Sequence, residues 1–173
     1  MRYASIVILC FAVAVSAANP PVRTEPIDPS RIIGNVHYET DEQEIRRVLD
    51  ALHDAASKAQ LERYFALFAP EAVYIGTDAT ERWSLEEFRG FVTPYFTQGR
   101  GWTYEPTSRH VTLGPENRTA WFDEILENES YGTTRGTGVL VKIEDDWKIV
   151  QYHLTIPVPN DLAKSVVRMI REQ

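Results

Sequence analysis

One carboxylate is a candidate for proton-transfer chemistry because its neighbours in the sequence are apolar. Asp123 lies in the middle of the run WFDEI, and strand alternation places it on the same face as Trp121 and Ile125. A carboxylate on an apolar face is costly unless it is paired or functional, and such a group suits general acid or base catalysis. Two alternatives stay open: Asp123 is a structural acid paired with an arginine or a tryptophan N–H, or the face of Phe122 and Leu126 is the core.

Two adjacent residues further along the chain are also candidates. Tyr152 lies on the apolar face of a predicted strand, where a buried hydroxyl needs a partner from the protein or from a ligand. His153 lies on the opposite, mixed face, which favours a dimer-interface or structural histidine, with catalysis as the alternative. Arg109 and His110, on another predicted strand, could pair with Asp123 across the sheet.

A polar loop of residues 76–83, GTDATERW, joins a predicted strand to a predicted helix. Loops in such positions often carry function, whereas the alternative is a turn held by Asp78 with Trp83 as a packing lid. Together with aromatic residues on the neighbouring elements, these residues make up the predicted ligand site: Tyr64, Asp78, Trp83, Tyr95, Trp121, Tyr152 and His153.

The sequence contains no pattern for a metal or a nucleotide cofactor. The four histidines show neither HxxxH nor HExxH spacing, and there is no GxSxG, P-loop or dinucleotide glycine motif. We therefore expect neither a metal nor a cofactor.

Residues 1–18 have the pattern of a secretory signal peptide: Arg2, an apolar run, and small residues at Ala17 and Ala18. The alternative, a membrane anchor, needs about 20 apolar residues, and this run is shorter. Cleavage near Ala17 or Ala18 would remove Cys10, the only cysteine, and leave 17 basic and 25 acidic residues, a formal charge of about −8. We expect a periplasmic or extracellular protein that binds neither nucleic acid nor membranes in its mature form, because phosphate binding needs clustered basic residues. Mass spectrometry should find its N-terminus at Ala18 or Asn19.

Residues 19–39 are rich in proline and predict a linker or arm. A capping box at Thr40 then opens an amphipathic helix that begins the folded domain, residues 40–160. A short helix over 60–69 is predicted to stop at Pro70 and to precede a strand over 72–76, and a second capping box at Ser84 opens a helix over 84–96, bent or ended by Pro94. Residues 161–173 predict a final amphipathic helix capped by Asn160.

Four runs of about ten residues predict consecutive antiparallel strands over 103–113, 118–128, 133–144 and 147–157. Helices followed by such a meander indicate an α+β fold in which the helices cover one face of a curved sheet. On the last strand, alternation assigns Tyr152 and Leu154 to the helix-covered face and Trp147, Ile149, Gln151 and His153 to the other. That half-apolar second face predicts a homodimer.

Three stretches resemble the SnoaL-like group of the nuclear transport factor 2-like (NTF2-like) superfamily: YFALFAPEAVYIGTDATERW, TAWFDEIL and RGTGVLVKIEDDWKIVQYHLTIPVPN. In that group a tryptophan commonly lies six residues before a histidine on the last strand, as Trp147 and His153 do here. The resemblance implies a cone-shaped α+β domain with an internal pocket. The superfamily includes polyketide cyclases, ketosteroid isomerases, dehydratases and non-catalytic binding or assembly domains.

Three functions are therefore open. The first is binding of a small, largely apolar molecule in the cone. The second is an isomerase- or cyclase-type enzyme with Asp123 as general acid or base. The third is a non-catalytic dimerisation or scaffold module.

Overall fold

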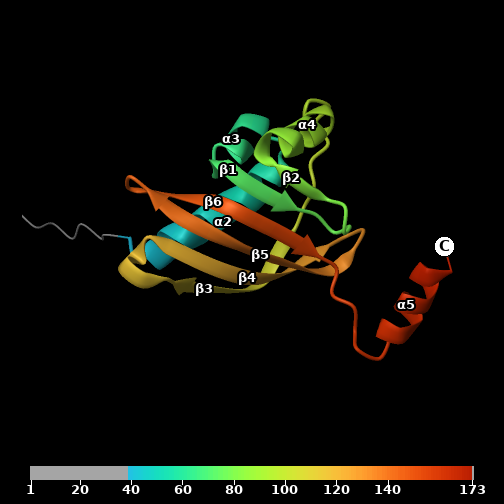
Figure 1. Ribbon diagram of the computed structural model, residues 1–173. Helices are drawn as coiled ribbons and strands as arrows, with labels where there is room; N and C mark the ends of the chain where they lie inside the picture. Colours follow the sequence, from blue (N-terminus) through green and yellow to red (C-terminus); the bar gives the residue numbers. More distant parts are fainter. Residues whose placement is uncertain (1–38, 173) are drawn as a thin grey trace, which may run out of the picture. The chain divides into compact units, whose positions relative to one another are not determined.

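The computed structural model describes residues 39–172 (Figure 1). The predicted signal peptide and almost all of the predicted arm lie outside these residues. No helix in the described part of the chain is both long enough and apolar enough to span a membrane.

The first described helix, α2 (Asp41–Ser57), begins where its capping box predicts. The Gln43 amide donates to Thr40 Oγ1 at 3.3 Å, and the Thr40 amide donates to Gln43 Oε1 at 2.8 Å. Both bonds satisfy donors that a helix N-terminus leaves free. The apolar stripe of α2 is buried, and Figure 1 shows the helix running across one face of the sheet.

The second predicted helix is shorter than expected. Helix α3 spans Leu61–Phe65, and β1 (Phe68–Ile75) already runs through Pro70. The helix ends early because the chain after it pairs with the last strand of the sheet. Phe68 lies opposite Ile149, and the Ile149 amide donates to Leu67 O at 2.9 Å. Helix α4 (Leu85–Phe96) has the predicted capping box at Ser84 and continues past Pro94.

The sheet has six strands in the order β2-β1-β6-β5-β4-β3. The short β2 (Arg82–Ser84) lies at one edge, and the predicted meander forms the rest: β3 (Glu105–Leu113), β4 (Thr119–Asn128), β5 (Gly132–Ile143) and β6 (Asp146–Thr155). A single turn of 3-10 helix, η1 (Pro115–Asn117), links β3 to β4. Only β1 and β6 pair in parallel. The predicted α+β class, with helices on a mainly antiparallel sheet, is confirmed.

The predicted faces of β6 are wrong in its first half. The pairing with β5 shifts, so that Val139 lies opposite Gln151 whereas Leu140 lies opposite Ile149. Val150 is the extra residue of a β-bulge, which reverses the alternation on one side of it. Trp147 and Ile149 are therefore buried on the same face as Tyr152.

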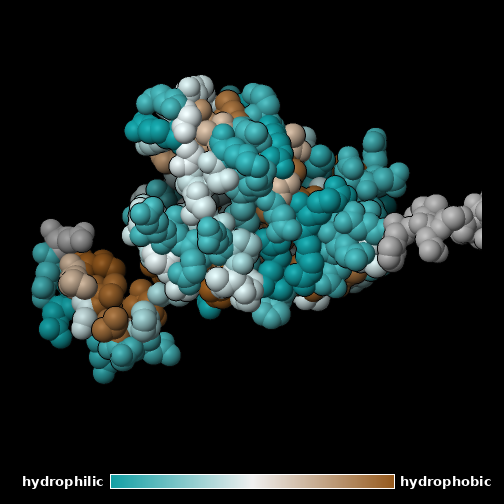
Figure 2. Space-filling model, turned by 180° about the vertical axis from the view of Figure 1, so that it is seen from behind, coloured by the Kyte–Doolittle hydropathy of each residue, from teal (hydrophilic) through white to brown (hydrophobic). Residues whose placement is uncertain are grey.

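Helix α5 (Ala163–Arg171) follows β6 and buries none of its residues. The predicted cap at Asn160 is wrong, because the first helical bonds run from the amides of Ser165 and Val166 to Leu162 O. Figure 2 shows its apolar side chains as a brown patch; Leu162, Val167, Met169 and Ile170 are exposed.

Candidate functional site

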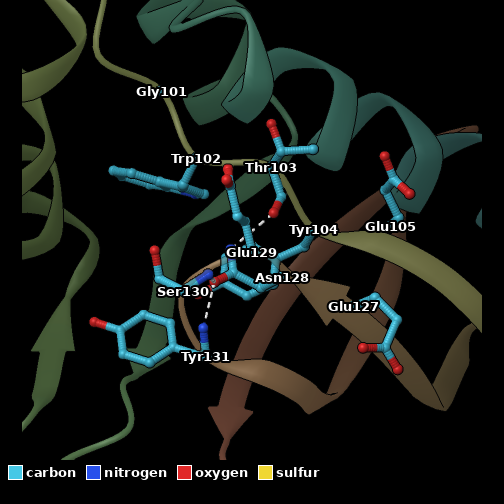
Figure 3. Close-up of a pocket in the computed structure, with 10 residues that line it drawn as sticks. All are labelled: Gly101, Trp102, Thr103, Tyr104, Glu105, Glu127, Asn128, Glu129, Ser130 and Tyr131. Atoms are coloured by element: carbon cyan, nitrogen blue, oxygen red, sulfur yellow. Dashed lines mark hydrogen bonds between the residues drawn. The ribbon is translucent and has the colours of Figure 1, made fainter.

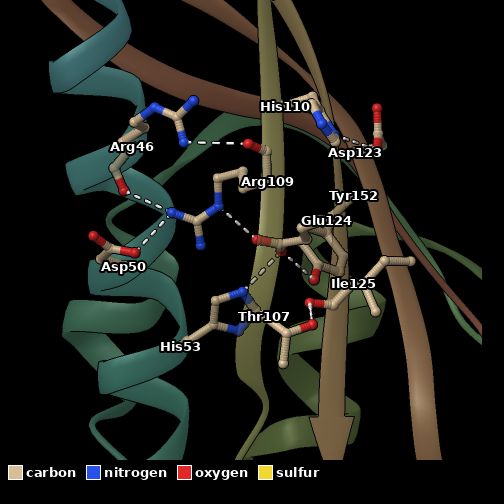
Figure 4. Close-up of polar contacts among 10 residues, drawn as sticks. All are labelled: Arg46, Asp50, His53, Thr107, Arg109, His110, Asp123, Glu124, Ile125 and Tyr152. Atoms are coloured by element: carbon tan, nitrogen blue, oxygen red, sulfur yellow. Dashed lines mark hydrogen bonds and ion pairs between the residues drawn. The ribbon is translucent and has the colours of Figure 1, made fainter.

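A buried carboxylate in the middle of β4 organises the polar contacts inside the fold (Figure 4). The Glu124 side chain is 0% exposed. Its Oε1 accepts from His53 Nε2 at 2.8 Å and from the Tyr152 hydroxyl at 3.1 Å. Its Oε2 accepts from Arg109 Nε at 2.7 Å. Both oxygens are thus satisfied, as a buried carboxylate requires.

Four elements bring these groups together. Arg109 lies opposite Glu124 on the neighbouring β3, and His53 reaches the carboxylate from α2 above the sheet. On the other side Gly136 of β5 separates Glu124 from β6. A Cβ on Gly136 would lie 2.5 Å from the Tyr152 hydroxyl oxygen and 2.9 Å from Glu124 Oε1. A glycine at this position therefore makes the contact between Glu124 and Tyr152 possible.

The basic neighbours of Glu124 offset the effect of burial on its pKa. Burial alone would raise the pKa of Glu124, but the hydrogen bond and charge of His53 and the charge of Arg109 outweigh it and hold this pKa below its ordinary value. Arg109 Nη1 also donates to Asp50 Oδ1 at 2.7 Å and to Arg46 O at 3.2 Å. Arg109 Nη2 is buried and has no hydrogen-bond partner within residues 39–172.

His53 and Tyr152 also line a narrow cavity of about 10 Å³ on the helix side of the sheet. Three more tyrosines line it, Tyr64, Tyr74 and Tyr104. Burial raises the pKa of Tyr64 and Tyr74 well above the ordinary tyrosine value and that of Tyr104 to about 12. All three hydroxyls are therefore protonated at neutral pH and can donate hydrogen bonds.

A wider pocket of about 340 Å³ lies next to the narrow cavity. Four residues line both: Tyr74, Trp102, Tyr104 and Leu154. The other lining residues of the wider pocket are Thr77, Glu81, Trp83, Phe88, Phe91, Tyr95 and Tyr131. We call the two cavities together the aromatic funnel. Its walls are stacked rings: Tyr74 packs face to face on Phe88 with centroids 3.7 Å apart, and Trp83 stacks on Phe91 at 5.0 Å.

A third hollow, an open cleft of about 710 Å³, adjoins the funnel at Trp102, Tyr104 and Tyr131 (Figure 3). The Asn128 side chain shapes it by donating to Thr103 O at 2.8 Å and accepting from the Tyr131 amide at 2.9 Å. The acidic and aliphatic hydroxyl side chains that line this cleft are exposed, whereas Glu124, at the base of the funnel, is buried; those side chains are Thr103, Glu105, Glu127, Glu129 and Ser130. We therefore place the candidate site in the funnel. Within residues 39–172 no group of three or more potential metal ligands comes together.

The family model described as SnoaL-like domain matches residues 45–159, from within α2 to just beyond the end of β6. The chain belongs to the SnoaL-like domain family. A comparison with curated proteins finds no significant match.

Solved structures share the fold of this SnoaL-like domain at low identity. A domain of unknown function with a cystatin-like fold from Nostoc punctiforme is 19% identical, with a TM-score of 0.62 over 74% of this chain and 84% of that one. A candidate dehydratase of the NTF2-like family from Streptomyces avermitilis is 15% identical, with a TM-score of 0.60 over 69% and 97%. A candidate aromatic ring hydroxylase from Novosphingobium aromaticivorans is 18% identical, with a TM-score of 0.56 over 69% and 90%. These likenesses show the fold alone.

Four of the predicted ligand residues line the aromatic funnel of the SnoaL-like domain: Tyr64, Trp83, Tyr95 and Tyr152. Asp78 does not. Its Oδ1 accepts from the Thr80 amide at 2.8 Å and from the Thr80 hydroxyl at 2.6 Å, which is the turn that was the alternative.

The predicted catalytic role of Asp123 is wrong for this funnel. Asp123 is 56% exposed on the outer face of the sheet, where it contacts His110 Nδ1 at 3.2 Å. The reason is the phase of β4, in which Phe122, Glu124 and Leu126 point to the helices and the alternate residues point away. Trp121 and His153 lie on that outer face too, outside the funnel.

The prediction did not include His53 or Glu124. Glu124 shares a face with Phe122 and Leu126, and that face was the stated alternative for the core. His53 lies four residues after the buried Leu49 on α2, so the two residues share one face of the helix. A polar residue on this apolar stripe is the sequence feature that could have identified His53.

Proposed function

We propose that this SnoaL-like domain binds a small, planar, largely apolar molecule with an oxygen atom at one end. The observation that carries this proposal is an aromatic-walled pocket whose inner end is lined by four tyrosines and a histidine. Stacked rings favour a flat apolar ligand, and protonated phenols favour an oxygen that accepts hydrogen bonds. The volume of about 340 Å³ lies at the lower end of the range of about 300–1,000 Å³ for small-molecule pockets.

Binding of 2-naphthol and naphthalene tests this proposal. Both are flat and apolar, but only 2-naphthol carries an oxygen. We expect saturable binding of 2-naphthol by calorimetry and a gain in thermal stability, with naphthalene bound about fivefold more weakly because one hydrogen bond is worth about 1 kcal/mol.

Two aromatic variants provide the matched control. Phe91→Ala removes a funnel wall and is expected to weaken 2-naphthol binding, whereas Trp121→Ala removes an aromatic side chain from the outer face and should leave it unchanged. Equal binding of the two compounds would contradict recognition of the oxygen atom, and equal loss of binding in both variants would contradict binding in the funnel.

We also propose that the domain forms a homodimer through the outer face of its sheet. The set of residues predicted from the sequence cannot form the dimer interface, because Trp147 and Ile149 are core residues. The outer face instead carries Trp121, which is 49% exposed and lies beside Val139, with Gln151 next across the strands. A two-fold axis would let two copies bury this patch against each other.

Sedimentation at micromolar concentration tests the dimer. We expect wild-type dimers and a monomeric Trp121→Glu variant, while Tyr131→Glu, which alters an exposed aromatic residue at the funnel, stays dimeric. A monomeric wild type or a dimeric Trp121→Glu variant argues against this interface. A dimer that fails to bind 2-naphthol would favour the alternative of a scaffold module.

A further inference from the structure

We propose that the C-terminal arm of this chain, residues 156–171, docks on the mouth of the aromatic funnel of a second copy of the protein. The arm consists of the segment that follows β6 and of helix α5. The inference goes beyond the binding of a small molecule, because it assigns a protein segment to the rim of the funnel and makes the site complete only in a pair of chains.

The arm carries apolar side chains that the described residues of its own chain leave exposed. No residue of α5 is buried. One stripe along the helix has the spacing i, i+4, i+7, i+8 and consists of Leu162, Val166, Met169 and Ile170. The large apolar residues of the arm that are exposed are Ile156, Val158, Leu162, Val167, Met169 and Ile170. A contiguous apolar surface of this kind marks an interaction site.

The segment between β6 and α5 resists folding back onto the funnel of its own chain. Strand β6 ends at Thr155, one residue after Leu154, which lines the funnel. Residues 156–159 form neither helix nor strand, and Pro157 and Pro159 keep them extended by fixing their own φ and restricting the residue before each. The arm would have to reverse direction directly after the strand to reach its own funnel. We therefore assign the docking site to a second copy.

The mouth of the funnel offers an apolar surface that fits such a helix. Phe91 and Tyr95 line it and are 45% and 39% exposed, and Tyr131 is 56% exposed. Phe91 and Tyr95 lie one turn apart on α4, with ring centroids 5.4 Å apart. A concave aromatic surface with exposed rings is the kind of groove that takes the apolar stripe of a short helix.

The two surfaces carry opposite charges. Helix α5 contains Lys164, Arg168 and Arg171 and no acidic residue. Among residues 39–172, the lining of the funnel and of the adjoining cleft includes no lysine or arginine, and its acidic residues are Glu81, Glu105, Glu127 and Glu129. The basic residues follow the apolar stripe by two positions, about 200° around the helix, and so lie on its opposite face. They therefore attract the arm to the acidic mouth over a distance rather than by contact, and salt screens this attraction.

Reciprocal exchange of arms closes the assembly. Each copy has one arm and one funnel, so a two-fold axis lets both arms dock and leaves neither surface free. The docked helix also covers the mouth of the funnel. A molecule inside the funnel then leaves only after the arm is released.

Cross-linking between chains tests the docking. Cys10 is the only cysteine in the sequence, so Cys10→Ser provides a background in which a bismaleimide joins introduced cysteines alone. An Ile170→Cys chain mixed with a Tyr95→Cys chain should give a covalent pair, and mass spectrometry should identify the two joined positions. The matched control mixes Arg168→Cys with Tyr95→Cys. Arg168 lies on the opposite face of α5, so this mixture should give far less of the covalent pair.

Sedimentation provides a second measurement without cross-linking. Ile170→Glu adds a charge to the docking stripe and should raise the dissociation constant of the dimer about tenfold. Ser165→Glu adds the same charge outside the stripe and should leave this constant unchanged. An unchanged constant for Ile170→Glu overturns the docking and leaves the dimer through the outer face standing.

The cross-linking outcomes separate the possible occupants of the funnel mouth. A cross-link within one chain of the double variant Ile170→Cys/Tyr95→Cys, with no joined pair in the mixture, overturns exchange between copies. Absence of both cross-links overturns docking of the arm. Neither measurement uses a ligand, so binding of 2-naphthol in the funnel is judged separately.

Discussion

Replacement of Glu124 by leucine is expected to lower the free energy of unfolding by about 3–5 kcal/mol, because it leaves a buried arginine without its main counter-charge. Arg109 Nε would lose its partner at 2.7 Å. The remaining partners of Arg109 are Arg46 O, which carries no charge, and Asp50, which is largely exposed and a weak substitute. The substitution also removes the acceptor of His53 Nε2 and of the Tyr152 hydroxyl. Urea unfolding followed by circular dichroism measures the loss.

Two further variants make this prediction specific. Asp123→Leu changes the adjacent carboxylate, which points to solvent, and should change stability by less than about 0.5 kcal/mol. The double variant Glu124→Leu/Arg109→Met removes both buried charges and should recover most of the loss. Equal effects of the two single variants would mean that Glu124 is not the buried acid.

Acidification should lower the free energy of unfolding of the wild-type protein because it protonates Glu124. The pKa of Glu124 lies below its ordinary value of 4.5 in the folded state. A lowered folded-state pKa contributes stability above the unfolded-state pKa, and this contribution disappears as the pH falls through the folded-state pKa. As the pH falls below about 4.5, the wild type should therefore lose more stability than the double variant does.

Replacement of Ile149 by glutamate should prevent folding or cost more than about 4 kcal/mol, because it places a charge in the core without a partner. Ile149 is 0% exposed on the helix side of β6. The Ile149→Glu variant should therefore lose stability, which urea unfolding measures. Strand alternation in the sequence had placed Ile149 on the dimer face, where the same substitution would have weakened dimerisation instead.

The control lies two residues further along the same strand. Gln151→Glu introduces the same charge on the outer face and should leave the free energy of unfolding nearly unchanged. A folded, monomeric Ile149→Glu variant with wild-type stability would show that Ile149 lies on the outer face and that the bulge at Val150 is absent.

Local patterns in the sequence were sufficient for the two long helices and the four antiparallel strands, but not for the short β2 or for the length of α3. The capping boxes at Thr40 and Ser84 are interactions within four residues, so the two long helices begin where the sequence predicts. The four antiparallel strands follow from alternation and from turn residues, which are equally local. Together with the quoted stretches, these patterns also indicated the SnoaL-like family.

The candidate site depended on contacts that no local pattern contains. Asp123 and Glu124 are adjacent acids on one strand, and which of them points inward depends on the phase of β4 against its neighbours and on Arg109 and His53 from other elements. The bulge at Val150 reverses the faces of β6 because β5 pairs with it in two registers. A shift of one residue moves every side chain to the other face, so only the tertiary structure could decide that Glu124 and Ile149 are buried and that Asp123 and Trp121 are exposed.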